Sequence, residues 1–379
     1  MVIDDDTYRT VGGLRFCIDL SHHPWTRPRV IASADAMGAA ASNTIGQIEA
    51  ADRAGLDSVW VSEDPDGWDA FSVLSAASRS TSRVRLGTGV TNPYLRHPNQ
   101  IAMSVSTLDR LTGGRAFLGL GRGQPEWYRN ALGVNAAGSP LRRLESTIRL
   151  LHQWWQPPYR ASSREAISVN DWARAIWPAQ DRPPIYLAAI GPKARDLAAR
   201  LADGLLIADF ASMPYLEWLL PEMRARVAGY GRDPDRFHIY VRTAIRVTED
   251  PEAYLHYRKT LMAVLAALPG MSQQIVHPDF DVGEIVRRIG EVMRTREVLR
   301  SGGNFIDIRR VADFVAARDQ IPDELIDDLS YVGEPAKVRA KLDRLAELGA
   351  THVFLATPAE PDAGDLHQQM SWLKAGSWN

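Results

Sequence analysis

The sequence has 379 residues, of which 45% are hydrophobic and 24% charged, and its formal net charge is −2. This nearly neutral balance gives no support for nucleic acid or an acidic membrane surface as a partner, and the single cysteine, Cys17, excludes an internal disulfide and a cluster of thiolate metal ligands. No apolar run reaches the ~20 residues of a membrane-spanning helix, and segment 1–13 lacks the pattern of a signal peptide, so we expect a cytoplasmic protein.

Short β-rich runs alternate with helical patterns along most of the chain. Most of these runs are almost continuously apolar, which is typical of parallel strands that are covered on both faces. We predict strands at Leu14–Leu20, Ser58–Ser62, Val84–Val90, Ala116–Gly121, Pro184–Ile190, Leu205–Asp209, His238–Val247 and His352–Thr357.

Amphipathic, well-delimited segments separate these strands. Leu141, Leu144, Ile148 and Leu151 recur at intervals of three and four residues, which places them on one face of a helix. Three more helices are predicted from a proline in the first turn and a glycine after the last. They run from Pro98 to Gly113-Gly114, from Pro192 to Gly204, and from Pro335 to Gly349.

Eight strands in series with helices between them predict an α/β protein, a single (β/α)₈ TIM barrel over residues 14–379 that follows a tail at 1–13. An open, doubly wound sheet is the alternative. We expect insertions after strands 1, 4 and 7, where lids and substrate pockets are usually built. They are an Ala/Ser/Gly-rich loop at Ala32–Ser42, a segment at Pro157–Pro184 with room for a hairpin, and a helical insertion at about 249–329 that includes helices Tyr254–Leu268 and Val282–Arg300.

In a barrel of this kind, catalytic residues follow the carboxyl ends of the strands. In chain order, this rule selects His22, His23, Trp25, Glu63, Asp64, Trp68, Thr91, Asn92, Tyr94, Arg122, Gln124, Glu126, Trp127, Ala189–Gly191 and Asp209. A half-buried carboxyl with a raised pKa at Glu63 or Asp64 would suit a proton donor, and a salt-bridged or capping pair is the alternative. For Trp68 and Trp127, pocket wall and core packing both stay open.

Several familiar sites are missing from the sequence. No dinucleotide-binding glycine pattern follows the first strand, and no Gly-x-Ser-x-Gly elbow is present. His22 and His23 point to opposite faces of an extended segment, and no cluster has ligand spacing, so we predict no metal site.

The turn Ala189-Ile190-Gly191 is more informative, because a strand ends there and Pro192 begins a helix. Free N–H groups at that helix end would cradle a phosphate, and a plain strand-to-helix turn is the alternative.

Four stretches together resemble the luciferase-like family of flavin- and deazaflavin-dependent oxidoreductases. They are Ala54–Asp64, Arg85–Gly121, Pro184–Gly204 and Gly333–Thr357. The most specific is Leu86-Gly87-Thr88-Gly89-Val90-Thr91-Asn92-Pro93-Tyr94, which is similar to the branch with methylenetetrahydromethanopterin reductase and F420-dependent dehydrogenases. The resemblance implies a barrel that is often dimeric, with the cofactor ring over the strand ends. It also implies a cis peptide at Gly89–Val90 in the bulge that backs the ring, cofactor contacts along Gly89–Asn92, and the cofactor phosphate at Ala189–Gly191.

The chain departs from these relatives at its candidate catalytic residues. The sugar-phosphate dehydrogenases have Asp-His where this chain has Glu63-Asp64, and Glu where it has Gln124. We therefore predict Glu63, Asp64 and Glu126 as catalytic candidates, with Asp209 among the cofactor-binding residues. His22, His23, Trp25, Trp68, Gln124 and Trp127 are the predicted substrate-binding residues. Arg122 matches a position that binds the phosphate of FMN in flavin-dependent members.

Three functions follow as hypotheses. The first is a coenzyme F420-dependent oxidoreductase that transfers a hydride to or from a small organic substrate. The second is a two-component, FMN-dependent monooxygenase that receives reduced flavin from a separate reductase and uses oxygen. The third is a barrel without catalysis that serves as a binding protein. For each we expect a homodimer.

Overall fold

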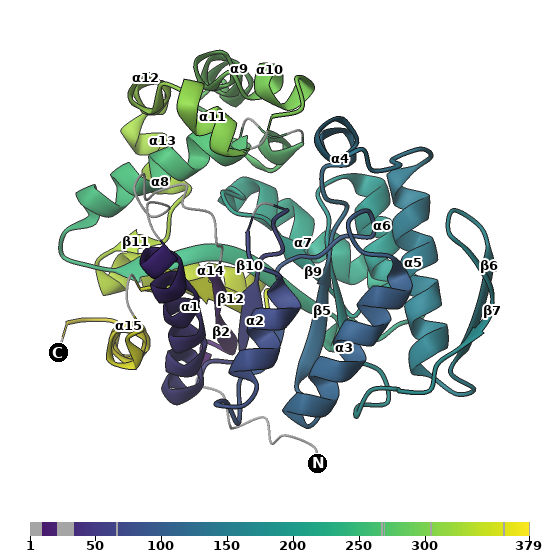
Figure 1. Cartoon of the computed structure of the whole chain (residues 1–379). Helices are drawn as coiled ribbons and strands as arrows, with labels where there is room; N and C mark the ends of the chain where they lie inside the picture. The colour runs from purple at the N-terminus through teal and green to yellow at the C-terminus, as the bar shows by residue number, and fades with distance from the viewer. Residues whose placement is uncertain are drawn as a thin grey trace.

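The structure, a computed structural model, describes residues 10–20, 34–65, 67–266, 268, 270–303, 305–358 and 361–378. Within this part of the chain, eight parallel strands form a barrel that is ringed by helices, and a group of short helices lies above one end (Figure 1). The barrel strands are β2 (Leu14–Leu20), β3 (Ser58–Val61), β4 (Arg85–Thr88), β5 (Ala116–Leu120), β8 (Ile185–Ala188), β9 (Gly204–Ile207), β10 (His238–Val247) and β12 (His352–Leu355).

The barrel is closed by the pairing of β2 with β3. Hydrogen bonds run around the ring in the order β2, β3, β4, β5, β8, β9, β10, β12 and back to β2. The closing pair aligns Cys17 with Ser58 and Leu20 with Val61. The predicted (β/α)₈ barrel is therefore confirmed, and the open-sheet alternative is wrong.

Helices cover the outside of this barrel, and their apolar faces form the main core against the strands. The predicted start signals hold, because Pro98, Pro192 and Pro335 each begin a helix, and Gly113 and Gly349 end α3 and α14 in left-handed conformations with φ of 68° and 96°. The helix after Pro192 ends at Leu201, so Gly204 is the first residue of β9 rather than a helix stop. The surrounding helices are α1 (Ala34–Ala54), α2 (Ala70–Ala77), α3 (Pro98–Thr112), α5 (Pro140–Trp155), α6 (Pro192–Leu201), α7 (Met213–Gly229), α14 (Pro335–Leu348) and α15 (Ala363–Ala375).

Two of the three insertions form as expected. The segment after α5 folds into an antiparallel hairpin of β6 (Arg160–Arg164) and β7 (Ser168–Ala173). The segment after β10 is helical, with its own hydrophobic core, and the predicted Val282–Arg300 helix is divided at Arg294, whose φ is 54°. Its helices are α8 (Pro251–Ala266), α9 (Val282–Met293), α10 (Thr295–Arg300), α11 (Phe305–Val311), α12 (Phe314–Asp319) and α13 (Asp323–Asp328).

The first insertion was predicted wrongly. Residues 34–42 belong to α1 and not to a loop, because the Ala-rich run has high helix propensity and continues without a break into the amphipathic stretch that follows. No helix in the described ranges is long and apolar enough to cross a bilayer.

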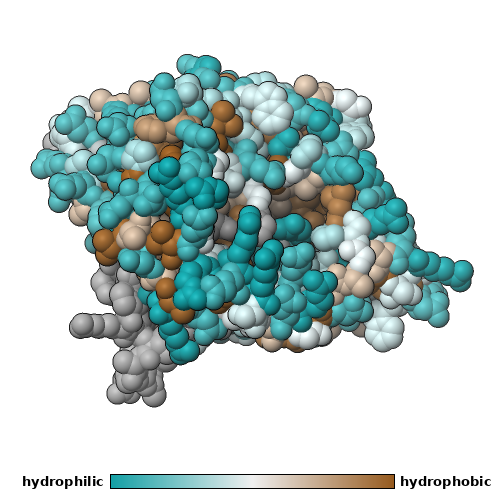
Figure 2. Space-filling view, turned by 90° about the horizontal axis from the view of Figure 1, so that it is seen from above, coloured by the Kyte–Doolittle hydropathy of each residue, from teal (hydrophilic) through white to brown (hydrophobic). Residues whose placement is uncertain are grey.

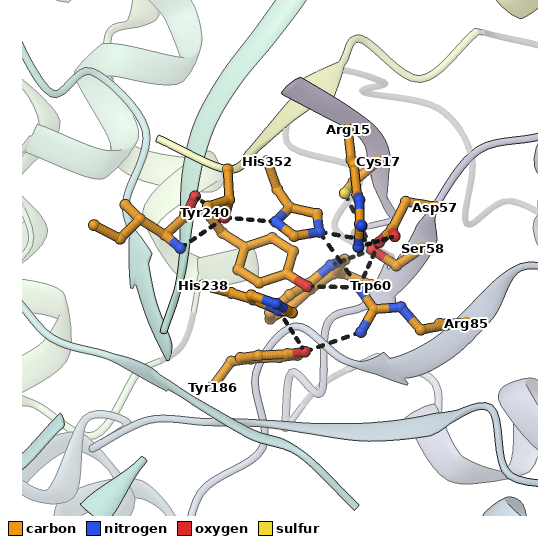
Figure 3. A network of polar contacts seen from close by, with 12 residues as sticks. Arg15, Cys17, Asp57, Ser58, Trp60, Arg85, Tyr186, His238, Tyr240 and His352 are labelled. Atoms are coloured by element: carbon orange, nitrogen blue, oxygen red, sulfur yellow. Dashed lines mark hydrogen bonds and ion pairs between the residues drawn. The ribbon is translucent and has the colours of Figure 1, made fainter. Parts of the chain in front are cut away.

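The end of the barrel where the strands begin, called here the barrel floor, is closed by a buried polar network (Figure 3). Arg85 pairs with Asp57 at 2.5 Å and donates to the hydroxyls of Tyr186 and Tyr240 at 2.9 and 2.8 Å. His352 Nε2 lies 3.4 Å from Asp57. Burial alone would raise the pKa of Asp57, but Arg85 and His352 outweigh it and hold that pKa well below its usual range.

An aromatic layer sits above this network and fills the barrel axis. The Trp60 indole packs against Phe117, Tyr240 and Phe354, with ring centroids 4.6 to 5.8 Å apart. Its Nε1 donates to the Ser58 hydroxyl below it, at 3.1 Å. The barrel axis is thus filled by side chains at this level, and the opposite end, where the strands finish, is where a barrel of this kind builds its active site.

Candidate active site

The end where the strands finish, called here the barrel mouth, is shaped by a bulge at Gly89–Val90, the β4 bulge. The Thr88 hydroxyl and the Thr91 N–H both donate to the carbonyl of Gly119, at 2.7 and 3.0 Å, so the two residues between them loop out of the sheet. The Gly89–Val90 peptide bond is cis, as the resemblance implies. A Cβ on Gly89 would lie 2.8 Å from Trp60 Cβ, so glycine is required where the bulge turns toward the barrel axis.

An Asp–Arg pair supports this bulge from below. Arg242, on β10, donates to the Gly89 carbonyl at 2.6 Å and pairs with Asp19, on β2, at 3.2 Å. The Ser62 hydroxyl donates to the same carbonyl at 3.2 Å. Strand β2, strand β10 and the β4 bulge therefore meet at one point, although they lie far apart in the sequence.

Asp19 is the carboxyl group whose environment best suits proton transfer. Burial raises its pKa from 3.8 to about 6; Arg242 opposes this shift, and the charges of Asp64 and Asp209 add to it. Its Oδ1 is buried without a hydrogen-bond partner in the described part of the chain. A pKa near neutrality at a strand end is the property expected of a general acid or base.

Sequence reasoning missed Asp19. The predicted first strand, Leu14–Leu20, includes this residue, whereas the rule for catalytic residues in a barrel selects positions that follow a strand. A charged residue between Ile18 and Leu20, one position before a strand end, was the available signal.

Glu63 is held in place by two donors. It accepts a short hydrogen bond from the Thr91 hydroxyl and an ionic one from Arg96 Nε at 2.7 Å, and Arg96 also pairs with Asp69. This carboxylate therefore orients Thr91 next to the β4 bulge. The salt-bridged alternative that the sequence left open describes it better than a free proton donor does.

The Asn92 side chain also accepts hydrogen bonds within its own turn. Its Oδ1 accepts the N–H groups of Tyr94 and Leu95, both at 3.1 Å, which makes it the cap of a turn. The side chain of Tyr94 is buried, and the guanidinium of Arg143 lies 4.7 Å from its ring centre. Burial raises the pKa of Tyr94, and the charges of Arg143 and Arg122 oppose this shift.

The predicted phosphate turn has the expected form. Gly191 precedes α6, no side chain caps that helix, and a Cβ on Gly191 would meet no atom within 4 Å. Behind the turn, Arg195 donates to the Ile190 carbonyl, contacts the Tyr215 hydroxyl at 3.1 Å and lies over the Trp218 ring. An open helix amino terminus with a guanidinium fixed behind it favours a bound anion.

Asp209 has a different partner from the one expected. It forms a two-pronged ion pair with Arg258 of α8, at 2.7 and 2.8 Å, and the Arg258 side chain is completely buried. The guanidinium also lies 4.2 Å from the ring centre of Phe210. Asp209 thus ties the helical insertion to the barrel mouth, and its predicted cofactor contact stays a prediction.

The residues after β5 separate into two groups. Arg122 and Glu126 are exposed near the first turn of α4 (Pro125–Leu132), and Gln124 precedes that helix without capping it. Trp127 is buried in the core of the insertion, and its indole donates to the Gly303 carbonyl at 2.7 Å, an environment that favours the packing alternative.

Trp68 is half-buried against the main core. The predicted residues His22, His23 and Trp25 lie outside the described residues. In the described part of the chain, no group of three or more His, Cys, Asp or Glu side chains could hold a metal ion. A view onto the mouth shows a hollow with hydrophobic side chains in its wall, beside the insertion (Figure 2).

Known proteins share this sequence pattern and architecture. A family model described as luciferase-like monooxygenase matches residues 22–352. A 5,10-methylenetetrahydromethanopterin reductase from Methanolobus tindarius is 27% identical over 320 residues, which cover 82% of this chain and 89% of that protein. An F420-dependent glucose-6-phosphate dehydrogenase from Kineococcus radiotolerans is 28% identical over 332 residues, which cover 84% of this chain and 88% of that protein.

The fold has a close match among solved structures. The coenzyme F420-dependent tetrahydromethanopterin reductase from Methanopyrus kandleri superimposes with a TM-score of 0.70 at 21% identity, covering 96% of this chain and 98% of that one. This likeness shows the shared barrel.

Proposed function

This chain belongs to the luciferase-like monooxygenase family and is an enzyme, and we propose that it is a coenzyme F420-dependent oxidoreductase that transfers a hydride to or from a small organic substrate. The third hypothesis, a barrel without catalysis, is set aside. The observation that carries the proposal is the β4 bulge with the ionisable Asp19 carboxyl beside it. Relatives whose names specify reductase or F420-dependent dehydrogenase chemistry support it.

The mouth fits a planar ring with a phosphate-bearing tail. Two buried side-chain atoms that make no hydrogen bond among the described residues belong to the Asp19–Arg242 pair beneath the β4 bulge, namely Asp19 Oδ1 and Arg242 Nε, and Arg195 Nε is a third, behind the phosphate turn. Buried polar groups are normally satisfied, so these atoms beside the β4 bulge and the phosphate turn support a ligand at the mouth. We place the ring against Gly89–Val90 and the phosphate on the amides of Ile190–Gly191 at the start of α6.

The chain's own residues divide the work of a hydride transfer. F420, when bound, supplies or accepts the hydride. Asp19 gives a proton to the substrate, or takes one from it, during the transfer. Glu63 orients Thr91, Arg242 holds the bulge, and Asp64 raises the pKa of Asp19 and is the second candidate acid.

The remaining predictions stay part of the proposal. Trp68 follows the end of β3, and Gln124 and Glu126 follow the end of β5, so a substrate at the mouth would meet them. We place the substrate between the β4 bulge and α4, and we keep the expectation of a homodimer. A separate reductase belongs only to the FMN alternative.

The FMN-dependent monooxygenase is the second candidate, and Arg122 is the observation that favours it. This exposed guanidinium follows β5 at the mouth and could bind a phosphate dianion with charge-assisted hydrogen bonds.

Protein fluorescence titrations with F420 and with FMN test the two candidates. Micromolar binding of F420 with no detectable binding of FMN supports the proposal, and the reverse pattern overturns it. The Arg122→Ala variant is the matched control. It should lose roughly 2–4 kcal/mol of FMN binding if FMN is the ligand, and should keep most of its affinity for F420 otherwise.

A further inference from the structure

A second bulge, on β10, faces the β4 bulge across the mouth. Strand β10 pairs in register with β12 up to Val241 opposite Val353, and pairing resumes with Ile245 opposite Leu355. Three residues of β10, Arg242–Ala244, therefore lie opposite a single residue of β12, Phe354. We call these three residues the β10 bulge. Ala244 has a φ of 46°, a left-handed conformation that residues with a Cβ rarely adopt.

The buried Thr243 side chain holds the β10 bulge in place. Its hydroxyl donates to the Phe354 carbonyl at 2.8 Å and accepts from the Phe354 N–H at 3.0 Å. One hydroxyl thus replaces the backbone groups that a regular strand would offer. Bulges of this kind re-aim side chains near active sites, and an unusual backbone conformation at a mouth is a reason to look for a role.

The side chain that this bulge aims is Arg242. Its Nη2 reaches the Gly89 carbonyl at 2.6 Å and Asp19 at 3.2 Å, and its guanidinium lies 5.9 Å from the ring centre of Phe354. Asp209, the next carboxylate at the mouth, has Arg258 as its own cation. The carboxylate that pairs directly with Arg242 is Asp19, which burial makes reluctant to ionise, and the charge of Asp64 lies near this pair.

We propose that Arg242 is a positioning residue that favours the hydride-loaded form of the bound cofactor. A hydride carries a negative charge, so a ring that accepts one becomes more negative by one unit until a proton follows. A guanidinium fixed directly behind the β4 bulge stabilises that extra charge more than it stabilises the oxidised ring. This inference rests on the proposed function and adds to it a residue that sets the reduction potential.

The test compares two arginines on the same strand. Arg242→Gln removes the charge at the bulge, and Arg246→Gln removes one that is paired with Asp365 of α15, at 2.7 Å, away from the bulge. For each purified variant, the dissociation constants of oxidised and of reduced F420 are measured anaerobically by fluorescence. The quantity of interest is the ratio of the two constants.

Arg242→Gln should change this ratio about tenfold against the reduced form, which is about 30 mV for a two-electron couple. Arg242→Lys should keep most of the wild-type ratio, and Arg246→Gln should leave it unchanged. If Arg242→Gln weakens the binding of oxidised and of reduced F420 equally, Arg242 serves only to support the bulge, and the inference is overturned.

Two further outcomes are informative. If the wild type binds FMN and not F420, the proposed function fails, and the same ratio measured with oxidised and reduced FMN still decides the role of Arg242. If Arg242→Gln does not fold, Thr243→Val takes its place, since it removes the hydroxyl that holds the bulge. It should shift the ratio in the same direction by a few-fold, and no shift counts against the inference.

Discussion

The two ends of the barrel each contain an Asp–Arg pair, and the pairs are tuned in opposite directions. At the floor, Asp57 pairs with Arg85 at 2.5 Å, and at the mouth Asp19 pairs with Arg242 at 3.2 Å. Burial favours the neutral acid at both ends. At the floor the nearby cations outweigh burial and lower the pKa of Asp57, whereas at the mouth burial prevails and raises the pKa of Asp19 to about 6.

The difference lies in the neighbours of each carboxylate. Both oxygens of Asp57 face a cation, Arg85 at 2.5 Å and Arg15 at 3.9 Å, and Arg85 also has the hydroxyls of two tyrosines. At the mouth the acceptors and donors are fewer, and the nearby charges of Asp64 and Asp209 are negative. The surroundings of Asp57 at the floor therefore keep its carboxylate ionised, whereas those of Asp19 at the mouth allow its carboxyl to gain and lose a proton near neutral pH.

Breaking the floor pair should have the largest effect on stability. Arg85→Met leaves the Asp57 carboxylate in a buried site without its main cation, and we expect a loss of about 3–5 kcal/mol in the free energy of unfolding. Arg242→Met at the half-exposed mouth should lose much less. Urea unfolding followed by circular dichroism measures both, and equal losses would contradict the distinction between the two ends.

Breaking the mouth pair should instead affect turnover. Asp19→Asn keeps the shape of the side chain but removes its exchangeable acid proton, so kcat should fall roughly 10²–10⁴-fold. The affinity for the cofactor should stay near wild type. A kcat within a few-fold of wild type would move the acid to Asp64, for which Asp64→Asn is the matched variant.

The two carboxyls should also give stability opposite pH dependences. The pKa of Asp19 is raised on folding, so its contribution is fully present below about pH 4 and is lost as the pH rises through about 6. The pKa of Asp57 is lowered, so its contribution is present above its unfolded value and is lost as the pH falls below it. Asp19→Asn should therefore gain stability relative to wild type between pH 4 and 7.

The same titration has a consequence for rate. If Asp19 donates the proton in substrate reduction, kcat/KM in that direction should fall as the pH rises above about 6. The Asp19→Asn variant should lack this pH dependence. Unfolding titrations and initial rates over this range check the two effects separately, and a wild-type profile without a change near pH 6 would argue against Asp19.

The sequence was a good guide to the fold and a partial guide to the site. Periodicity, together with proline and glycine at helix ends, located the barrel strands to within a few residues, because those signals are local. The β4 bulge was expected from the family resemblance, and the open turn before α6 was expected because Gly191 and Pro192 follow a strand. Asp19, Arg242 and the Asp209–Arg258 pair depend on which strands and helices become neighbours, and a single sequence contains no local signal for that.

The smallest expected effect compares the two ends of one strand, because Ser58 begins β3 and Ser62 follows its last residue. Ser58→Ala leaves the buried Trp60 Nε1 without its acceptor, so we expect a loss of about 1–3 kcal/mol in stability and little change in cofactor affinity. Ser62→Ala leaves the Gly89 carbonyl with Arg242 as its remaining donor, so its cost in stability should be below about 1 kcal/mol. Because the carbonyl belongs to the bulge under the proposed ring, the affinity for F420 should fall a few-fold in Ser62→Ala alone. Equal changes in F420 affinity for the two variants would show that the mouth and the floor are coupled through β3 and Trp60. In that case the floor would affect cofactor binding as well as stability.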